Sequence, residues 1–79
     1  MSYEVIVQLK KEVLDPEARA IHETLGRLGF SGLRSVAVSK RYVLDLEGEG
    51  AGQGAELADK IARDFLTNPV AETYVIRKL

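Results

Sequence analysis

The segment from Leu9 to Phe30 constrains the fold most, because the end of a strand, the start of a helix and the end of that helix all lie within it. Asp15 can cap a helix, and Pro16 suits the first helical position, where its missing N–H would have no partner anyway. Gly29 can adopt the left-handed conformation that ends many helices. The segment therefore predicts a helix that begins after Asp15 and stops before Gly29.

The spacing of apolar residues agrees with this division. Before the helix, apolar and polar residues alternate as in a half-buried strand, with the apolar set at Tyr3, Val5, Val7 and Leu9. Within the helix the apolar residues recur at intervals of three and four, at Ala18, Ile21, Leu25 and Leu28. A strand followed by an amphipathic helix is the expected result.

The segment from Leu33 to Leu46 is either one long strand or a hairpin that turns at Ser39 and Lys40. A two-residue hairpin turn usually needs Gly, Asn or Asp, which are missing there. An unbroken strand places the apolar even-numbered residues on one face. These are Val36, Val38, Tyr42, Leu44 and Leu46. One long, bent strand is favoured, and a three-residue loop that restores the alternation is the alternative.

The second half repeats the plan. Four glycines alternate between Gly48 and Gly54, which predicts a loop. A helix should follow, with its apolar stripe at Leu57, Ala58, Ile61, Ala62 and Phe65. Asn68 and Pro69 should end it, because a residue before proline avoids helical dihedral angles. A last strand is expected from Val70 to Leu79.

Together the elements predict one α+β domain over residues 1–79 in the order β-α-β-α-β. We expect a two-layer sandwich in which both helices cover one face of a small sheet. The other face would keep Ile6 and Val43, and both sheet edges would be open to pairing. A chain of this size buries only about 60% of its unfolded surface. These features favour self-association, with the sheet extended by dimerisation.

Composition excludes several classes of protein. The 11 basic residues against 12 acidic ones argue against nucleic-acid binding, and the absence of cysteine excludes disulfides, thiolate nucleophiles and thiolate metal sites. The start Met1-Ser2-Tyr3-Glu4 is unlike a signal peptide, and every apolar run is shorter than the roughly 20 residues of a membrane span. We expect a soluble, cytoplasmic protein without nucleic-acid or membrane partners.

Three groups of residues resemble chemical sites, and each has a simpler interpretation. Gly50-x-Gly52-x-x-Ala55 matches a dinucleotide fingerprint formally, but too few strands follow it for a Rossmann unit. Asp45, Glu47 and Glu49 could ligate a hard metal, but a solvated strand end explains them as well. His22 has no second histidine or cysteine near it and is expected at the surface. No catalytic, cofactor or metal residue is therefore predicted.

The tyrosines and the basic pairs bear on binding. Tyr3, Tyr42 and Tyr74 share the phase of the aliphatic residues, so we expect core tyrosines and not a base-stacking RNA surface. Lys40 and Arg41 interrupt the middle strand, where burial without a counter-charge would be costly. A partner carboxylate or an exposed bend must accommodate them. The candidate interface residues are Lys40, Arg41, Lys10 and Tyr42.

Several short motifs in the chain resemble the PurS family, the small subunit of phosphoribosylformylglycinamidine (FGAM) synthase. The most specific are Val13-Leu14-Asp15-Pro16 and Asn68-Pro69-Val70-x-Glu72-x-Tyr74. Val7-x-Leu9-Lys10, Leu25-x-x-Leu28-Gly29-Phe30 and Val36-x-Val38-x-Lys40 support them. The chain departs from the family where Arg19, Ala37 and Ser39 stand, and Ala37 weakens any role carried over from a family arginine.

The resemblance implies a ferredoxin-like-related PurS-like fold and a role in purine biosynthesis. The FGAM synthase complex uses ATP and glutamine to convert formylglycinamide ribonucleotide to its amidine. The small subunit, a dimer or dimer of dimers, would bridge the glutaminase and synthetase subunits and assist ammonia transfer. It would have no catalytic activity alone and bind no cofactor, since ATP and Mg²⁺ belong to the synthetase subunit. The alternative is a stand-alone ferredoxin-like module that binds a small regulatory ligand.

Overall fold

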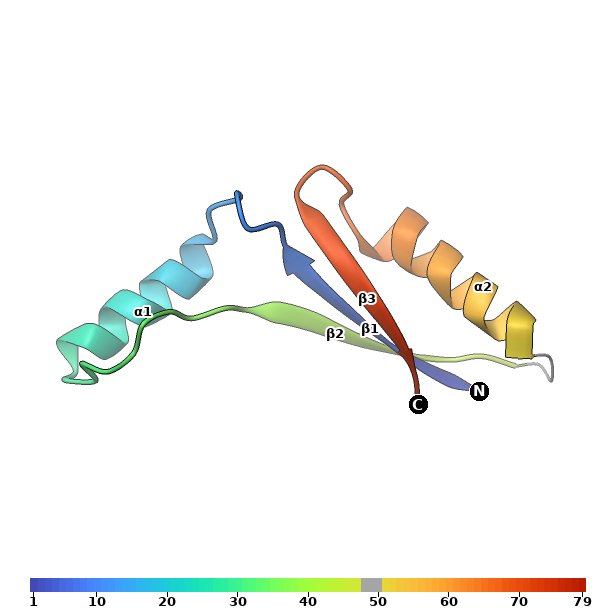
Figure 1. Cartoon of the computed structure of the whole chain (residues 1–79), viewed down its shortest axis with the longest axis horizontal. Helices are drawn as coiled ribbons and strands as arrows, with labels where there is room; N and C mark the ends of the chain where they lie inside the picture. Colours follow the sequence, from blue (N-terminus) through green and yellow to red (C-terminus); the bar gives the residue numbers. More distant parts are fainter. Residues whose placement is uncertain (48–50) are drawn as a thin grey trace.

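The computed structural model describes residues 1–47 and 51–79 and confirms the predicted order of elements. The elements are β1 (Ser2–Leu9), α1 (Pro16–Arg27), β2 (Ser39–Asp45), α2 (Ala51–Ile61), a short π-helical turn η1 (Ala62–Leu66) and β3 (Glu72–Lys78) (Figure 1). The molecule is elongated, with extents of 51 × 25 × 13 Å. This shape places α1 at one end and the sheet with α2 at the other (Figure 1).

The three strands form one antiparallel sheet in the order β2-β1-β3. Strands β2 and β3 both run opposite to β1, so they are parallel to each other, and α2 connects them across β1. Val5 lies between Tyr42 and Ile76 in this register, and all three side chains point to the face that α2 covers. We call this the helix face. The opposite face, with Glu4, Ile6 and Val43, is called the open face.

The core is thin and lies between α2 and the helix face. Tyr3, Val5 and Val7 are buried on the sheet side, and Ala58 and Ala62 are buried on the helix side. Partly buried side chains pack around them, namely those of Tyr42, Leu44, Leu66, Tyr74 and Ile76. The small alanines bring α2 close to the strands, as dense packing with few large side chains requires.

The prediction of a loop from Gly48 to Gly54 is wrong at Gly54, which is helical. Residues 48–50 lie outside the described residues, but α2 begins at Ala51, and Gly54 is a buried helical residue. A Cβ atom on Gly54 would lie 2.8 Å from Met1 Cε and 2.9 Å from Tyr3 Oη. The close contact with β1 therefore explains why a glycine occupies this helical position. Glycine has a weak helix propensity, and on that ground alone the sequence favours a loop here.

The π-helical turn changes the inward face at the end of α2. The predicted stripe placed Phe65 in the core, but Phe65 is 78% exposed, and Leu66 packs against the core instead. A π-helical turn contains more residues than an α-helical turn, so it moves the next inward position along the chain. Leu57, also predicted inward, is largely exposed as well.

The turn between η1 and β3 is built by the Asn68-Pro69-Val70-x-Glu72 motif. The Asn68 side chain accepts a hydrogen bond from Val70 N (3.1 Å), and its backbone oxygen accepts bonds from Ala71 N (3.1 Å) and Glu72 N (2.7 Å). Glu72 accepts in return from Asn68 N (2.8 Å). The predicted helix end is confirmed, and reciprocal polar contacts fix the entry into β3.

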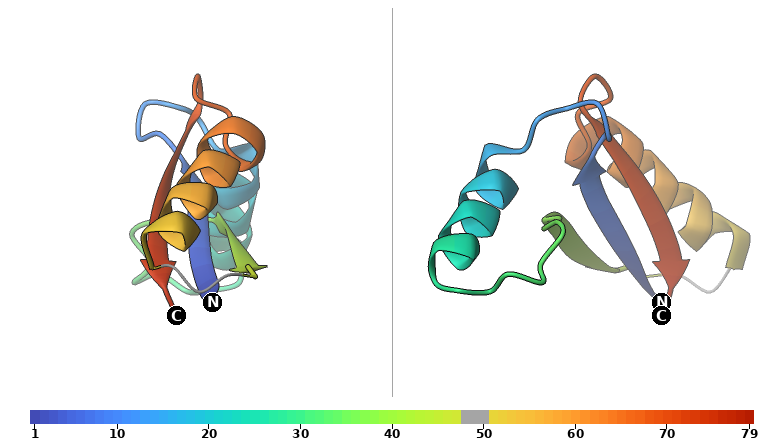
Figure 2. Two further views of the ribbon diagram at one scale, coloured as in Figure 1. Left: turned by 90° about the vertical axis from the view of Figure 1, so that its right-hand side faces the viewer. Right: turned by 60° about the vertical axis from the view of Figure 1, so that its left-hand side comes forward.

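Helix α1 does not lie where the sequence predicted it. Among the described elements only α2 covers the helix face, whereas α1 lies beyond the end of the sheet (Figures 1 and 2). Residues 10–15 carry the chain out from β1, and residues 33–38 carry it back to β2. Six extended residues can span about 20 Å, which is enough to hold α1 away from its own sheet. We call residues 10–38 the arm.

The middle segment is a single strand and not a hairpin, as favoured from its alternation. Its paired part is shorter than expected, because β2 runs only from Ser39 to Asp45. Gln8 pairs with Ser39, and β1 ends at Leu9, so residues 33–38 extend past the end of their neighbouring strand. For that reason they pair with no strand in residues 1–47 and 51–79.

Candidate assembly surface

The helix of the arm is defined locally by its ends. The Asp15 carboxylate accepts a hydrogen bond from Ala18 N (3.1 Å), Pro16 occupies the first turn, and Gly29 has a φ of +99°. These observations confirm the predicted cap, start and stop. Arg19 and Glu23, four residues apart on the helix, form an exposed ion pair (3.2 Å). Residues within the segment itself therefore define where the helix begins and ends.

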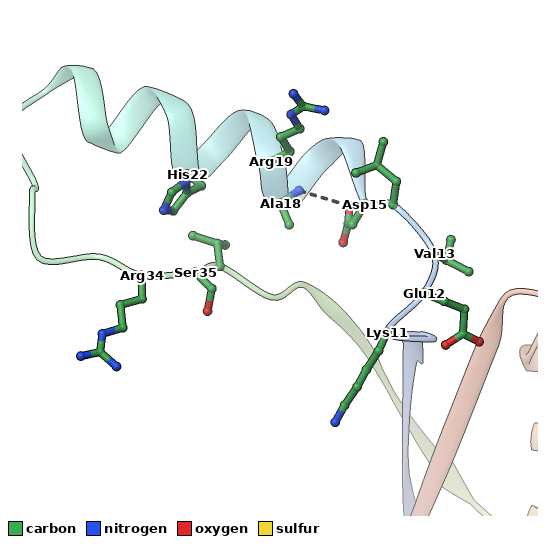
Figure 3. A pocket seen from close by; sticks show the side chains of 11 residues that line it. Lys11, Glu12, Val13, Asp15, Ala18, Arg19, His22, Arg34 and Ser35 are labelled. Carbon is green, nitrogen blue, oxygen red and sulfur yellow. Dashed lines mark hydrogen bonds between the residues drawn. The ribbon is translucent and has the colours of Figure 1, made fainter.

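A cleft of about 440 Å³ separates α1 from residues 33–38, which we call the returning segment (Figure 3). His22 closes it at one point, where Nε2 lies 3.0 Å from the carbonyl oxygen of Leu33. A carbonyl can only accept, so Nε2 carries the proton in this contact. His22 is half-buried and joins the two sides of the arm, which corrects its assignment as a plain surface residue.

The charged side chains around the cleft do not converge on a common point. Arg19 points away from the returning segment, whereas Arg34 and Lys11 extend on the other side of it (Figure 3). Binding sites for small ligands place a few polar groups toward one centre. The cleft is thus better described as a gap between two sides of the arm than as a ligand pocket.

Apolar side chains are exposed along the arm. Ile21 on α1 is 38% exposed and Leu28, which follows α1, is 68% exposed, although the predicted apolar stripe includes both. Leu14 and Phe30, which flank the helix, are also mostly exposed. Leu25, Phe30, Gly32 and Leu33 line an apolar hollow at the tip. Large exposed apolar patches of this kind mark protein interaction surfaces.

The four predicted interface residues do not form one patch. Lys40 and Tyr42 share the helix face of β2, where Lys40 is exposed and Tyr42 is half-buried. Arg41 lies on the open face, and Lys10 follows β1, where its backbone N donates to Ala71 O (2.9 Å). Their role at an interface stays a prediction, and only Lys40 and Tyr42 lie on the same face.

Arg41 has its counter-charge within the chain, which sequence reasoning missed. Glu4 accepts a hydrogen bond from Arg41, and Arg77 Nη2 lies 3.1 Å from the other Glu4 oxygen. The Glu4 side chain is only 12% exposed. The hydrogen bond from Arg41, together with the charges of both arginines, lowers the pKa of Glu4 below its ordinary value, against the opposing effect of burial. This pairing could not be predicted without the strand register, which places Glu4 opposite Arg77.

The other groups considered from sequence form no site in the described part of the chain. Asp45 lies 4.0 Å from the Met1 amino group, Glu47 is exposed, and Glu49 lies outside the described residues. Across residues 1–47 and 51–79 no cluster of His, Asp or Glu is arranged to hold a metal ion. The match to a dinucleotide fingerprint begins at Gly50, also outside the described residues, and the strands that neighbour each other are all antiparallel.

The tyrosines support the helix face, as predicted. Tyr3 is buried beside Gly54, and Tyr74 donates a hydrogen bond to Asp59 Oδ1 (2.7 Å). This bond, which fixes α2 to β3, is the main cause of the raised pKa of Tyr74.

None of the described helices is both long and apolar enough to traverse a lipid bilayer.

Comparison with known proteins gives one consistent result. The family model PurS, described as phosphoribosylformylglycinamidine (FGAM) synthase, matches residues 2–79. The PurS subunit of phosphoribosylformylglycinamidine synthase from Mycobacterium leprae is 40% identical over 74 residues, covering 94% of this chain and 90% of that protein. The corresponding subunit from Methanocaldococcus jannaschii is 37% identical over 73 residues, covering 92% and 88%.

Solved structures agree with these relatives. The crystal structure of PurS from Methanocaldococcus jannaschii has a TM-score of 0.86 at 34% identity, covering 96% of this chain and 92% of that one. A chain in the PurLQS structure from Thermotoga maritima has a TM-score of 0.89 at 27% identity, with coverage of 99% and 95%. The extended arrangement of arm and sheet is therefore shared with experimental structures.

Proposed function

The chain belongs to the PurS family of phosphoribosylformylglycinamidine (FGAM) synthase subunits, and we propose that it serves that enzyme as a non-catalytic assembly subunit. The enzyme is a glutamine-dependent ligase of purine biosynthesis that converts formylglycinamide ribonucleotide to its amidine with ATP. We assign the chemistry to the glutaminase and synthetase subunits. This chain contributes contacts between proteins.

The exposed apolar surface of the arm is the observation that carries this proposal. Helix α1 is capped by its own residues, and its apolar stripe is not covered by the sheet of the same chain. Exposing such a stripe costs about 25 cal/mol per Å², so a protein keeps it when another surface covers it in the assembly. An arm of this form suits a subunit that joins other proteins.

The way in which such a subunit helps follows from the reaction. Ammonia released from glutamine must reach the activated amide before it escapes or is protonated in water. A bridging chain that fixes the glutaminase against the synthetase shortens that path. The PurLQS structure from Thermotoga maritima, which contains a chain that matches 99% of the present one, supports such an assembly.

The proposal also covers cofactors and location. The chain binds no cofactor itself, and ATP with Mg²⁺ is held by the synthetase subunit. The complex works in the cytoplasm, where its nucleotide substrates are found.

Reconstitution tests the proposed function. The rate of FGAM formation from glutamine is measured with the glutaminase and synthetase subunits, with and without this chain. Free ammonia replaces glutamine in a parallel series, since it bypasses the transfer between subunits. We expect a large dependence on this chain with glutamine and a small one with ammonia. Equal glutamine-dependent rates with and without the chain would refute the proposal.

A further inference from the structure

The open face of the sheet has no cover within residues 1–47 and 51–79. Helix α2 lies on the other face, and α1 lies beyond the end of the sheet (Figures 1 and 2). An antiparallel sheet can leave one face to water, but that face is then largely polar. Here Val75 is 57% exposed and Val43 is 50% exposed, and Ile6 on the central strand is half-buried. An exposed apolar surface of this kind calls for a partner.

Three charged side chains lie among these apolar residues. Glu4 on the central strand contacts Arg41 of β2 through one carboxylate oxygen and Arg77 of β3 through the other. The Glu4 side chain is nearly buried, whereas the side chains of Arg41 and Arg77 are 53% and 70% exposed. Glu4 thus holds both arginines on the open face before any partner arrives. Holding them in place reduces the conformational entropy that they lose when a partner binds.

This cluster has an unbalanced positive charge, because two guanidinium groups share one carboxylate. Asp45, at the end of the same face, lies instead 4.0 Å from the Met1 amino group. Arg41 contacts Glu4 through Nε, and Arg77 does so through Nη2. A guanidinium carries several N–H donors in a planar fork that fits a carboxylate. The cluster is therefore suited to bind a second carboxylate.

Charge disfavours a second copy of the chain as the partner on this face. A two-fold axis places the same patch on both sides of an interface, so two positive clusters would meet there. Like charges that face each other weaken association, whereas an acidic surface strengthens it. The strand lysines, Lys40 and Lys78, both lie on the helix face. The open face of the three strands carries arginine instead, which is the cation enriched in protein interfaces.

We propose that the open face docks another protein, through a surface on which a carboxylate lies among apolar side chains. The carboxylate of the partner pairs with Arg41 and Arg77, and its apolar side chains cover Val43 and Val75. Arg41 then has the interface role predicted from the sequence, and Glu4 positions it. This inference rests on the proposed function, which supplies the candidate partners, the glutaminase and synthetase subunits.

Two substitutions at one position test the charge of the partner surface. Val75→Asp and Val75→Lys both replace an exposed valine and differ in the sign of the new charge. Binding of the full chain to a mixture of the glutaminase and synthetase subunits is measured by isothermal titration calorimetry. Val75→Asp should raise the dissociation constant at least about tenfold more than Val75→Lys does. The difference should shrink at high salt, which screens charges. Val70→Asp is the control, because Val70 is 81% exposed but lies in the turn before β3, and it should bind like the unsubstituted chain.

The other outcomes are equally distinct. Equal dissociation constants for Val75→Asp and Val75→Lys would overturn the proposal, and so would tighter binding of Val75→Asp, which indicates a basic partner surface. Light scattering gives the mass of each variant alone. A lower mass for Val75→Asp than for the unsubstituted chain would also overturn the proposal, because the open face would then join copies of the chain. Val43→Asp and Val43→Lys provide a second pair on β2 if Val75→Asp does not fold. If the unsubstituted chain does not bind the two subunits, the proposed function itself fails, whereas binding that ignores both pairs refutes the docking surface alone.

Discussion

Gly54→Ala tests the close packing of α2 against β1. The added Cβ would meet Met1 Cε at 2.8 Å, Tyr3 Oη at 2.9 Å and Tyr3 Cε2 at 3.2 Å. The methionine end can move easily, but the tyrosine ring is buried and must shift as a unit. Overpacking of this kind costs about 1–3 kcal/mol. Alanine gains about 1 kcal/mol over glycine in a helix, so the net loss should be about 0–2 kcal/mol.

Gly26→Ala is the matched control for this substitution. Gly26 is also helical, but a Cβ there would meet nothing within 4 Å. It should therefore stabilise the protein by about 0.5–1 kcal/mol. Thermal unfolding of both variants is compared at one protein concentration, because assembly changes the apparent stability. Gly54→Ala should melt below Gly26→Ala by at least about 2 °C. Equal stabilisation by the two substitutions would refute the close-packing explanation.

Substitutions at three further positions test local features. Asp15→Ala should lower the free energy of unfolding by about 1 kcal/mol, measured by chemical denaturation, because Ala18 N loses its cap; an unchanged value would contradict the capping role. Asn68→Ala should cost about 1 kcal/mol, since the bond to Val70 N is lost, and Asn68→Asp, which keeps an acceptor, should retain most of the stability. The lowered pKa of Glu4 means that its contribution is present above its unfolded pKa and is lost as pH falls through the folded value. Glu4→Gln should therefore melt well below the unsubstituted chain at neutral pH and approach it at acidic pH; a constant gap would argue against the contribution of Glu4.

Local signals in the sequence predicted the elements well. Asp15, Pro16 and Gly29 act on the backbone within one helical turn, so their roles are visible without the fold. Alternation likewise predicted the two faces of β1 and the single middle strand, because side-chain direction in a strand depends only on residue parity.

The remaining features depend on contacts between distant segments. Gly54 looked like a loop residue because its helical state depends on Tyr3, which is far away in the sequence. The charge compensation of Arg41 by Glu4 required the strand register. The apolar stripe of α1 indicated that one face of the helix should be buried. It did not indicate that the sheet of the same chain lies too far away to bury it. Sequence patterns reveal an apolar face, and only the fold reveals what covers it.

A titration of the glutamine-dependent rate against this chain tests the central claim most directly. Fixed amounts of the glutaminase and synthetase subunits receive increasing amounts of the chain, and FGAM formation is followed. An assembly subunit predicts a rate that rises and then stops at a defined ratio of chains, while the ammonia-dependent rate stays nearly flat. A glutamine-dependent rate that ignores the chain would contradict the account, and so would product formed by the chain without the other subunits.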